Sequence, residues 1–208
     1  MIEIHIPHNS QNQKFDISKQ LLQPFDQISI DFITTISKEI LSNPQYKSFP
    51  EIIALGFWMR KTHIQKLEQI FKSQTKQSFK LGRGIAFHIT PSNVDTMFVY
   101  SWFLSLLVGN SNIIKLSTTK SIQTKILLDL IQKTINLSKY QTIKEKTILL
   151  TYTHNDDITY QLSQLADIRI IWGGDNTIEH IRQIPIKPSS TELIFADKFS
   201  FSIISAAH

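Results

Sequence analysis

Short runs of isoleucine, leucine and valine alternate with longer amphipathic stretches from residue 82 onward. The runs predict strands at 85–89, 112–116, 147–152, 168–172 and near 193–195, and the stretches between them predict helices at 94–108, 121–137, 156–166 and 177–184. Strands that alternate with helices are typical of βαβ units, whose parallel sheet carries helices on both faces. We therefore predict an α/β, Rossmann-like fold, with the turns after the strands along one edge, where ligands of open α/β sheets bind.

The N-terminal third of the chain has a helical pattern that is richer in polar residues. Apolar side chains recur at four-residue steps from Ile28, and Pro44 ends that helix. A second helix is predicted at 50–71, with a proline in its first turn. Residues 1–81 are therefore expected to form a mainly helical segment that precedes the Rossmann-like domain at 82–208.

Composition narrows the class of protein. The 208 residues are 41% hydrophobic and 19% charged, as in an ordinary soluble globular protein, and the net charge is +5. The basic residues are scattered without aromatic interleaving, which argues against nucleic-acid binding and fits attraction for anions such as nucleotide cofactors and acyl carriers. The chain has no cysteine, as a reducing cytoplasm permits. The longest apolar stretch, at 97–108, is too short to span a membrane, so a cytoplasmic location is expected.

The turn Thr90-Pro91-Ser92-Asn93-Val94 follows a predicted strand and opens a predicted helix. Two alternative roles suit its side chains. Ser92 or Asn93 caps the helix, which stabilises it by ~1 kcal/mol, or the Asn93 amide donates a hydrogen bond to a developing oxyanion. Taken alone, the turn favours the cap.

Two further strand ends carry candidate chemistry. Lys115 closes an isoleucine-rich strand, and its position fits equally a surface lysine that reaches into water and a cation that holds a ribose hydroxyl or a phosphate. Gly173-Gly174 joins a strand to a helix, where glycine lets the backbone approach a phosphate. A plain helix entry capped by Asp175 is the alternative.

Other motifs carry less chemistry. Gly82-Arg83-Gly84 precedes its strand and is interpreted as a turn, and Gly109 is predicted to end the preceding helix. The seven histidines include no pair at metal-binding spacing with a carboxylate partner, so no metal site is predicted.

The chain resembles LuxC-type fatty acyl-CoA reductases, a branch of the aldehyde dehydrogenase superfamily, in the segments HITPSNVDTMFVYSWFLSLLVGNSNIIKLS, IRIIWGGDNTIEHIRQIPIKP and ELIFADKFSFSII. The resemblance runs from about Gly82 to the last residues, and several motifs in the right order make it specific. It implies an NADP-binding domain at 82–208, with the catalytic domain truncated.

The resemblance implies roles for individual residues. Asn93 falls on the superfamily's oxyanion-stabilising asparagine, which makes it the catalytic candidate. Gly173 and Gly174 fall on the Gly-Ser that starts the pyrophosphate-facing helix, and Trp172 stands where the superfamily usually has threonine.

The adenosine ribose is expected at the other strand end. Lys115 falls on the lysine that holds this ribose, next to Ser117 and Thr118. NAD-preferring relatives often carry a carboxylate at the position of Thr118, which repels a 2′-phosphate. Because Thr118 is neutral and Lys120 lies nearby in sequence, NADP(H) is the expected cofactor.

The family's mechanism implies a cysteine thiolate that takes the acyl group from a thioester, followed by hydride transfer that releases an aldehyde. Without a cysteine, this chain is expected to supply the cofactor-binding part, with little turnover alone. Expected partners are a fatty acyl thioester, an acyl-transfer protein and further copies of a full-length chain. A non-catalytic nucleotide- or partner-binding module and a basic α/β domain that binds RNA or another polyanion are the alternatives. The cofactor hypothesis requires Lys115 and Gly173 at one edge of the molecule.

Overall fold

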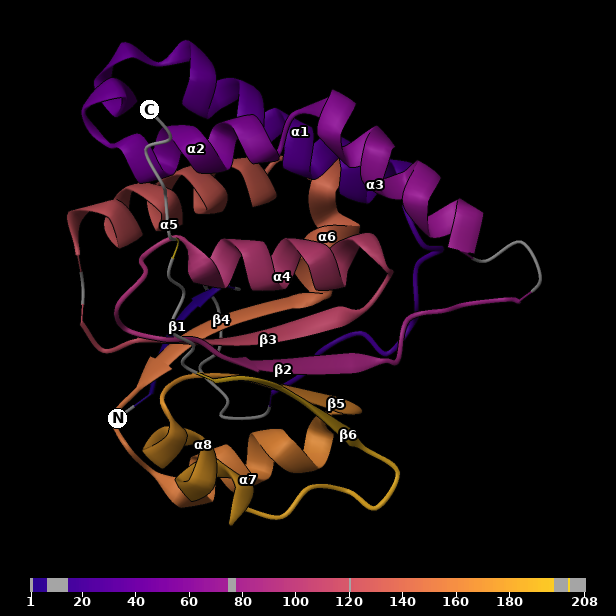
Figure 1. Ribbon diagram of the computed structural model, residues 1–208, viewed down its shortest axis with the longest axis vertical. Coiled ribbons are helices and arrows are strands. Elements are labelled where there is room, and N and C mark those ends of the chain that lie inside the picture. Colours follow the sequence, from indigo (N-terminus) through magenta and orange to yellow (C-terminus); the bar gives the residue numbers. More distant parts are fainter. Residues whose placement is uncertain (1, 7–14, 75–77, 120, 197–201, 203–208) are drawn as a thin grey trace, which may run out of the picture.

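A six-stranded sheet lies between two layers of helices (Figure 1). The computed structural model describes residues 2–6, 15–74, 78–119, 121–196 and 202, and the elements counted below lie within these residues. The strands are β1 (Ile2–Ile6), β2 (Ile85–Ile89), β3 (Ser111–Leu116), β4 (Thr147–Tyr152), β5 (Ile168–Trp172) and β6 (Thr191–Phe195). Their order in the sheet is β1-β4-β3-β2-β5-β6. In this order, every neighbouring pair after the first, from β4–β3 to β5–β6, is parallel.

Helices cover both faces of this sheet. They are α1 (Gln27–Ser42), α2 (Pro50–Trp58), α3 (Lys61–Gln74), α4 (Met97–Leu107), α5 (Ile122–Ile135), α6 (Gln141–Glu145), α7 (Asp156–Leu165) and α8 (Asp175–Arg182). Figure 1 shows α7 and α8 on one face, α4 and α5 on the other, and α1 to α3 as an outer layer beyond them. Neighbouring residues such as Ile113 and Ile114 point into the separate cores on the two faces. The predicted α/β, Rossmann-like fold is thus confirmed.

The N-terminal helices follow their apolar stripe for the most part. In α1, Phe32, Ile36 and Ile40 are fully buried, and the helix ends just before Pro44 as predicted. The single helix predicted at 50–71 is wrong, because the chain bends at Met59 and continues as α3. The bend lets both Met59 and Ile64 reach the core.

The strand β1 is an element that the sequence pattern did not reveal within the segment 1–81. It pairs antiparallel with β4, and Ile4 stands opposite Leu150. A short alternating segment is stable only against an existing sheet edge, and that edge comes from the distant β4. The division of the chain at residues 81 and 82 stays a prediction.

The turn that ends α4 depends on one glycine. Gly109 has a φ of +93°, and a side chain there would collide with the carbonyl oxygen of Leu22. Glycine adopts this left-handed conformation at little cost, so the predicted helix end is confirmed.

The order of the strands determines where a ligand can bind. From β2 the chain moves through β3 to β4 on one side, and then crosses to β5 and β6 on the other side of β2. The winding therefore reverses between β2 and β5. In open α/β sheets, a crevice forms at the carboxyl ends of the strands at such a point.

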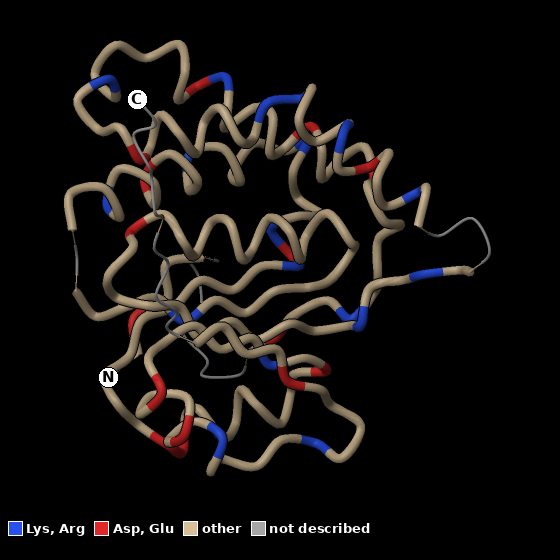
Figure 2. The backbone as a smooth tube through the Cα atoms, in the orientation of Figure 1, with Lys and Arg blue, Asp and Glu red and all other residues tan. Residues whose placement is uncertain are grey.

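The prediction that the basic residues are scattered is wrong, because the excess positive charge lies in one stretch away from these carboxyl ends. Residues 60–83 carry seven basic side chains and one acidic one, whereas the rest of the sequence carries 15 and 16. Figure 2 shows the described basic residues of this stretch in blue. They lie along α3 and along the segment that leads into the amino end of β2. The net charge of +5 therefore says little about the carboxyl edge of the sheet. Across the described residues, each helix is too short or too polar to cross a membrane.

A hydrogen-bonded ion pair secures the amino end of β2. The Asp167 carboxylate accepts the backbone N–H of Ile85 at 2.8 Å and the ammonium of Lys187 at 2.6 Å. Burial alone would raise the pKa of Asp167, but these hydrogen bonds and the nearby positive charge hold the pKa below its ordinary value.

This pKa shift predicts a pH dependence of stability. Because the folded-state pKa lies below the unfolded value of about 3.9, the carboxylate stabilises the fold above that pH and loses the effect as the pH falls through the folded-state pKa. We expect Asp167→Asn to lower the free energy of unfolding by ~1 kcal/mol at pH 6, since the pair is partly exposed. Urea unfolding between pH 6 and pH 2.5 should show the two proteins converging below about pH 4. A constant difference across that range would contradict the assignment.

Candidate functional site

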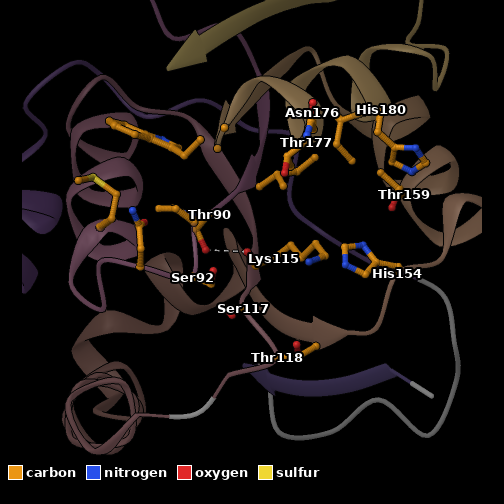
Figure 3. A pocket seen from close by; sticks show the side chains of 18 of the residues that line it. Thr90, Ser92, Lys115, Ser117, Thr118, His154, Thr159, Asn176, Thr177 and His180 are labelled. Atoms are coloured by element: carbon orange, nitrogen blue, oxygen red, sulfur yellow. Dashed lines mark hydrogen bonds between the residues drawn. The ribbon is translucent and has the colours of Figure 1, made fainter. Parts of the chain in front are cut away.

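A cleft of about 1120 Å³ opens at the carboxyl ends of the parallel strands. Segments that follow β2, β3, β4, β5 and β6 all contribute to its wall. The seven candidate residues from the sequence line it together: Asn93, Lys115, Ser117, Thr118, Trp172, Gly173 and Gly174. Figure 3 labels Lys115, Ser117 and Thr118 among the side chains that line it. Lys115 and Gly173 thus share one edge, as the cofactor hypothesis requires, while the role of each residue stays a prediction.

The ends of β2 and β3 are tied together at the centre of this cleft. Ile89 stands beside Lys115 on one side and Ile171 on the other. The Thr90 hydroxyl and backbone N–H both donate to the carbonyl oxygen of Lys115, at 2.8 Å and 3.2 Å. The backbone below the Lys115 side chain is therefore held firmly.

The turn after β2 does not cap a helix. The helix predicted from residue 94 starts only at Met97, with Thr96 at the cap position and no side-chain cap among the described residues. The favoured interpretation of Ser92 or Asn93 as a cap is therefore wrong. Both side chains are exposed along the cleft, which leaves the Asn93 amide available to a ligand.

Lys115 lies within the cleft and does not extend over an open surface. Its Nζ atom lies 5.0 Å from the centre of the Tyr152 ring, and Figure 3 shows the side chain pointing toward His154. Partial burial removes water from the ammonium and lowers the pKa of Lys115. A partly desolvated cation interacts more strongly with an anionic ligand than an exposed one does.

Tyr152 is itself fixed in place beneath this lysine. Its hydroxyl lies 3.0 Å from the Thr159 hydroxyl, whose proton is donated to the carbonyl oxygen of Asn155. Burial raises the pKa of Tyr152 to about 12. The ring is therefore neutral at pH 7, and it supports the ammonium through a cation–π contact.

The turn after β5 presents different donors from those expected. The N–H of Gly173 donates to the carbonyl oxygen of Phe195 at 3.2 Å, so the strand pair already uses it. Gly174 occupies the cap position of α8, and Asp175 is the first helical residue, so the alternative of Asp175 as the cap is wrong. The backbone N–H groups of Asp175 and Asn176 begin the helix without partners inside it. An anion at this end of the cleft would meet these groups.

Thr118 lies on the exposed part of the cleft wall after β3. The neighbouring Ser117 hydroxyl accepts the backbone N–H of Thr119 at 3.1 Å, which shapes the turn. Lys120, the other basic residue of the NADP(H) argument, lies outside the described residues.

Trp172 connects the cleft to the core. Its indole N–H donates to the Ser101 hydroxyl of α4 at 3.0 Å. Its ring stacks on Phe195, with centroids 3.9 Å apart and planes 7° from parallel. The side chain therefore has little freedom to turn.

Several cleft residues escaped the sequence analysis, among them Tyr152, His154 and Asn176. Ligands of open α/β sheets bind at the carboxyl ends of the strands, which is why Lys115 was a candidate. The same rule would have found Tyr152 and His154, because they lie at the end of the next predicted strand or shortly after it. His180 contacts Asp156 at 2.9 Å across the start of α7, and no sequence spacing announces that pair. Within the described residues, no group of three or more His, Asp or Glu side chains could hold a metal ion.

Comparison with solved structures places this fold among aldehyde dehydrogenases. The chain superposes on a NAD-dependent benzaldehyde dehydrogenase from Corynebacterium glutamicum with a TM-score of 0.56 and 12% identity, over 81% of this chain and 40% of that one. A glyceraldehyde-3-phosphate dehydrogenase from Methanocaldococcus jannaschii complexed with NADP gives 0.53 and 14%, over 81% and 41%. The NADP-dependent enzyme of the same name from Bacillus halodurans, also complexed with NADP, gives 0.51 and 14%, over 82% and 38%.

At sequence identities this low, the structural similarity establishes the fold alone. The chain spans about two fifths of the length of the dehydrogenases it matches. The search among curated proteins gives no match. The sequence from residue 62 to residue 208 matches the acyl-CoA reductase family LuxC. Because that match covers well over half of the chain and agrees with the fold and the order of the cleft motifs, the chain belongs to the LuxC family of acyl-CoA reductases.

Proposed function

We propose that this chain supplies the cofactor-binding part of an NADPH-dependent reductase, which converts long-chain fatty acyl thioesters to fatty aldehydes. The observation that carries the proposal is the convergence of Lys115 and the start of α8 on one cleft, in a chain of the LuxC family. The thioester comes from coenzyme A or from an acylated protein.

The residues of the cleft fit a dinucleotide. Lys115 supplies a partly desolvated cation at one end, suited to the adenosine ribose and its phosphate. At the other end, the first N–H groups of α8 suit the diphosphate. The winding of the sheet reverses between β2 and β5, which is where dinucleotides bind in this class of fold.

The chemistry of the reaction divides between the cofactor and the protein. A bound nicotinamide supplies a hydride, and the balanced reaction converts a thioester, NADPH and a proton into an aldehyde, a thiol and NADP⁺. Asn93 would donate its amide hydrogen to the oxygen that gains negative charge as the acyl carbon is attacked. The covalent step in the family needs a thiolate, which a chain without cysteine does not provide.

The expected preference for NADPH rests on Thr118. A neutral side chain at this point of the wall leaves a 2′-phosphate unopposed, whereas a carboxylate there would repel it. Calorimetry should show tighter binding of NADPH than of NADH. Thr118→Glu should weaken NADPH binding by about tenfold or more and spare NADH, and Thr118→Ser serves as the matched control. Equal affinities in the unmodified chain, or a preference for NADH, would exclude this part of the proposal.

The activity itself is tested by turnover. The chain should bind NADPH and release little or no aldehyde from a long-chain acyl-CoA, because the nucleophile is missing. The same assay with a cysteine-containing remainder of a LuxC protein added in trans should restore aldehyde formation. If NADPH does not bind at all, the hypothesis that this chain binds the cofactor is wrong.

A non-catalytic module that binds a nucleotide or an acyl-transfer partner is the second candidate, and the lack of cysteine is the observation that favours it. It predicts NADPH binding with no aldehyde under either condition.

A further inference from the structure

A row of hydrogen bonds runs from the cleft into the core behind Trp172. The indole N–H of Trp172 donates to Ser101 Oγ at 3.0 Å, and Ser101 Oγ lies 2.8 Å from His88 Nδ1. His88 Nε2 lies 3.1 Å from Asn112 Oδ1, and Asn112 Nδ2 donates to the carbonyl oxygen of Asn110 at 2.8 Å. Ser101, His88, Asn112 and Asn110 are all buried.

The donor and the acceptor of each hydrogen bond in this row can be assigned. The carbonyl oxygen of Asn110 can only accept, so the amide nitrogen of Asn112 faces it and the amide oxygen faces His88. His88 Nε2 must then carry the proton. Burial lowers the pKa of His88 to about 4, so the imidazole is neutral at pH 7 and Nδ1 is an acceptor. Ser101 therefore donates to His88 and accepts from Trp172, whose indole nitrogen is a donor only.

Trp172 is held at its face as well as at its nitrogen. The stacked Trp172 and Phe195 rings join the carboxyl ends of β5 and β6, and both side chains line the cleft. Phe195 is 37% exposed, so the pair presents aromatic surface to whatever occupies the cleft. A ring with both its hydrogen bond and its stacking partner fixed forms a wall that needs no rearrangement on binding.

The position of this wall within the strand order indicates which part of a ligand it meets. Lys115 is the next-to-last residue of β3, on one side of β2, whereas Trp172 and Phe195 end β5 and β6, on the other side. A dinucleotide with its adenosine ribose at Lys115 and its diphosphate at α8 would extend its second ring toward β5 and β6.

We propose that Ser101 and His88 are positioning residues that lock the indole of Trp172, so that the Trp172–Phe195 pair forms a flat wall for the nicotinamide ring. This proposal rests on the proposed function, namely the binding of NADPH. It adds two residues behind the cleft, Ser101 and His88, to those that line it. Loss of the Ser101 hydroxyl leaves the indole N–H without its buried acceptor, which favours rotation of the ring toward water.

The test uses the indole N–H signals of the three tryptophans in a proton–nitrogen correlation spectrum, with Trp172 assigned by the Trp172→Phe variant. In Ser101→Ala, the Trp172 N–H should exchange with water about tenfold faster or more, and NADPH should bind about fivefold more weakly. Ser105→Ala is the matched control, because Ser105 is buried one turn along α4 and its hydroxyl binds Asn110 instead of Trp172. Thermal unfolding of both variants reports any general loss of stability.

Ligand fragments identify the ring that the wall meets. Reduced nicotinamide mononucleotide should shift the Trp172 signal, and adenosine 2′,5′-bisphosphate should not. Unchanged exchange in Ser101→Ala overturns the role of Ser101. NADPH binding without a shift at Trp172, or a shift with the adenosine fragment alone, overturns the wall and leaves the proposed cofactor standing. Absence of NADPH binding in the unmodified chain overturns both.

Discussion

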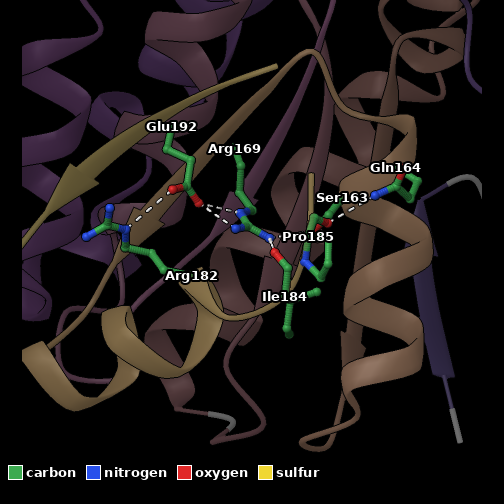
Figure 4. Close-up of polar contacts among 7 residues, drawn as sticks. All are labelled: Ser163, Gln164, Arg169, Arg182, Ile184, Pro185 and Glu192. Carbon is green, nitrogen blue, oxygen red and sulfur yellow. Dashed lines mark hydrogen bonds and ion pairs between the residues drawn. The ribbon is translucent and has the colours of Figure 1, made fainter. Parts of the chain in front are cut away.

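Replacing Glu192 with alanine is expected to lower the free energy of unfolding by about 3–5 kcal/mol. The Arg169 guanidinium is 1% exposed between β5 and α7, and its charge is balanced by Glu192 of β6 (Figure 4). Glu192 Oε1 accepts from Nε at 2.8 Å and from Nη2 at 2.5 Å. The remaining donor, Nη1, binds the Ser163 hydroxyl and the carbonyl oxygen of Ile184. Without the carboxylate, a buried charge remains unpaired.

Two control variants separate this effect from a simple loss of contacts. The double variant Arg169→Met with Glu192→Leu removes both charges and should recover most of the stability, because apolar side chains of similar size often replace a buried ion pair at little cost. Arg182→Ala should change stability by less than about 0.5 kcal/mol, since this exposed arginine reaches Glu192 only at 3.5 Å. The measurement is urea unfolding at pH 7. A loss below about 1 kcal/mol in Glu192→Ala would show that water already solvates Arg169.

Replacing Lys115 with methionine is expected to weaken NADPH binding about a hundredfold, or ~2.7 kcal/mol. The size follows from the loss of a charge-assisted contact at a partly desolvated site, where such contacts are worth about 1.5–3 kcal/mol. Methionine keeps the length and apolar character of the side chain, so its contact with the Tyr152 ring is largely retained. Calorimetric titration with NADPH measures the change.

Lys125→Met is the matched control for this variant. Lys125 is exposed on α5 and does not line the cleft, so its loss changes the net charge equally and should leave the affinity within about twofold. Similar losses in the two variants would mean that NADPH responds to the overall charge. No loss in Lys115→Met would remove Lys115 from the cofactor site.

The strands and their order along the chain could be predicted because the signal is local. A run such as residues 147–152 has no charged side chain and is buried at every position, since both faces of a central parallel strand are covered. The same reasoning located the turns after β2, β3 and β5, and parallel strands place such turns at one edge. Lys115 and Gly173 could therefore be assigned to one edge before any contact was known.

Contacts between distant segments could not be predicted in this way. The strand β1 exists because the distant β4 offers it an edge. The N–H of Gly173 is occupied because Phe195 of β6 lies beside it. None of these partners lies within the few residues that a local pattern samples.

By itself, the sequence determined the layered α/β architecture, the family and the edge at which the candidate residues meet. Only the tertiary structure decided which of their hydrogen-bonding groups are still available and which side chains hold them in place. The physical reason is the range of the forces involved. Apolar periodicity records burial residue by residue, whereas the hydrogen bond from Trp172 to Ser101 joins residues 71 positions apart and exists only where the folded chain brings the end of β5 to α4.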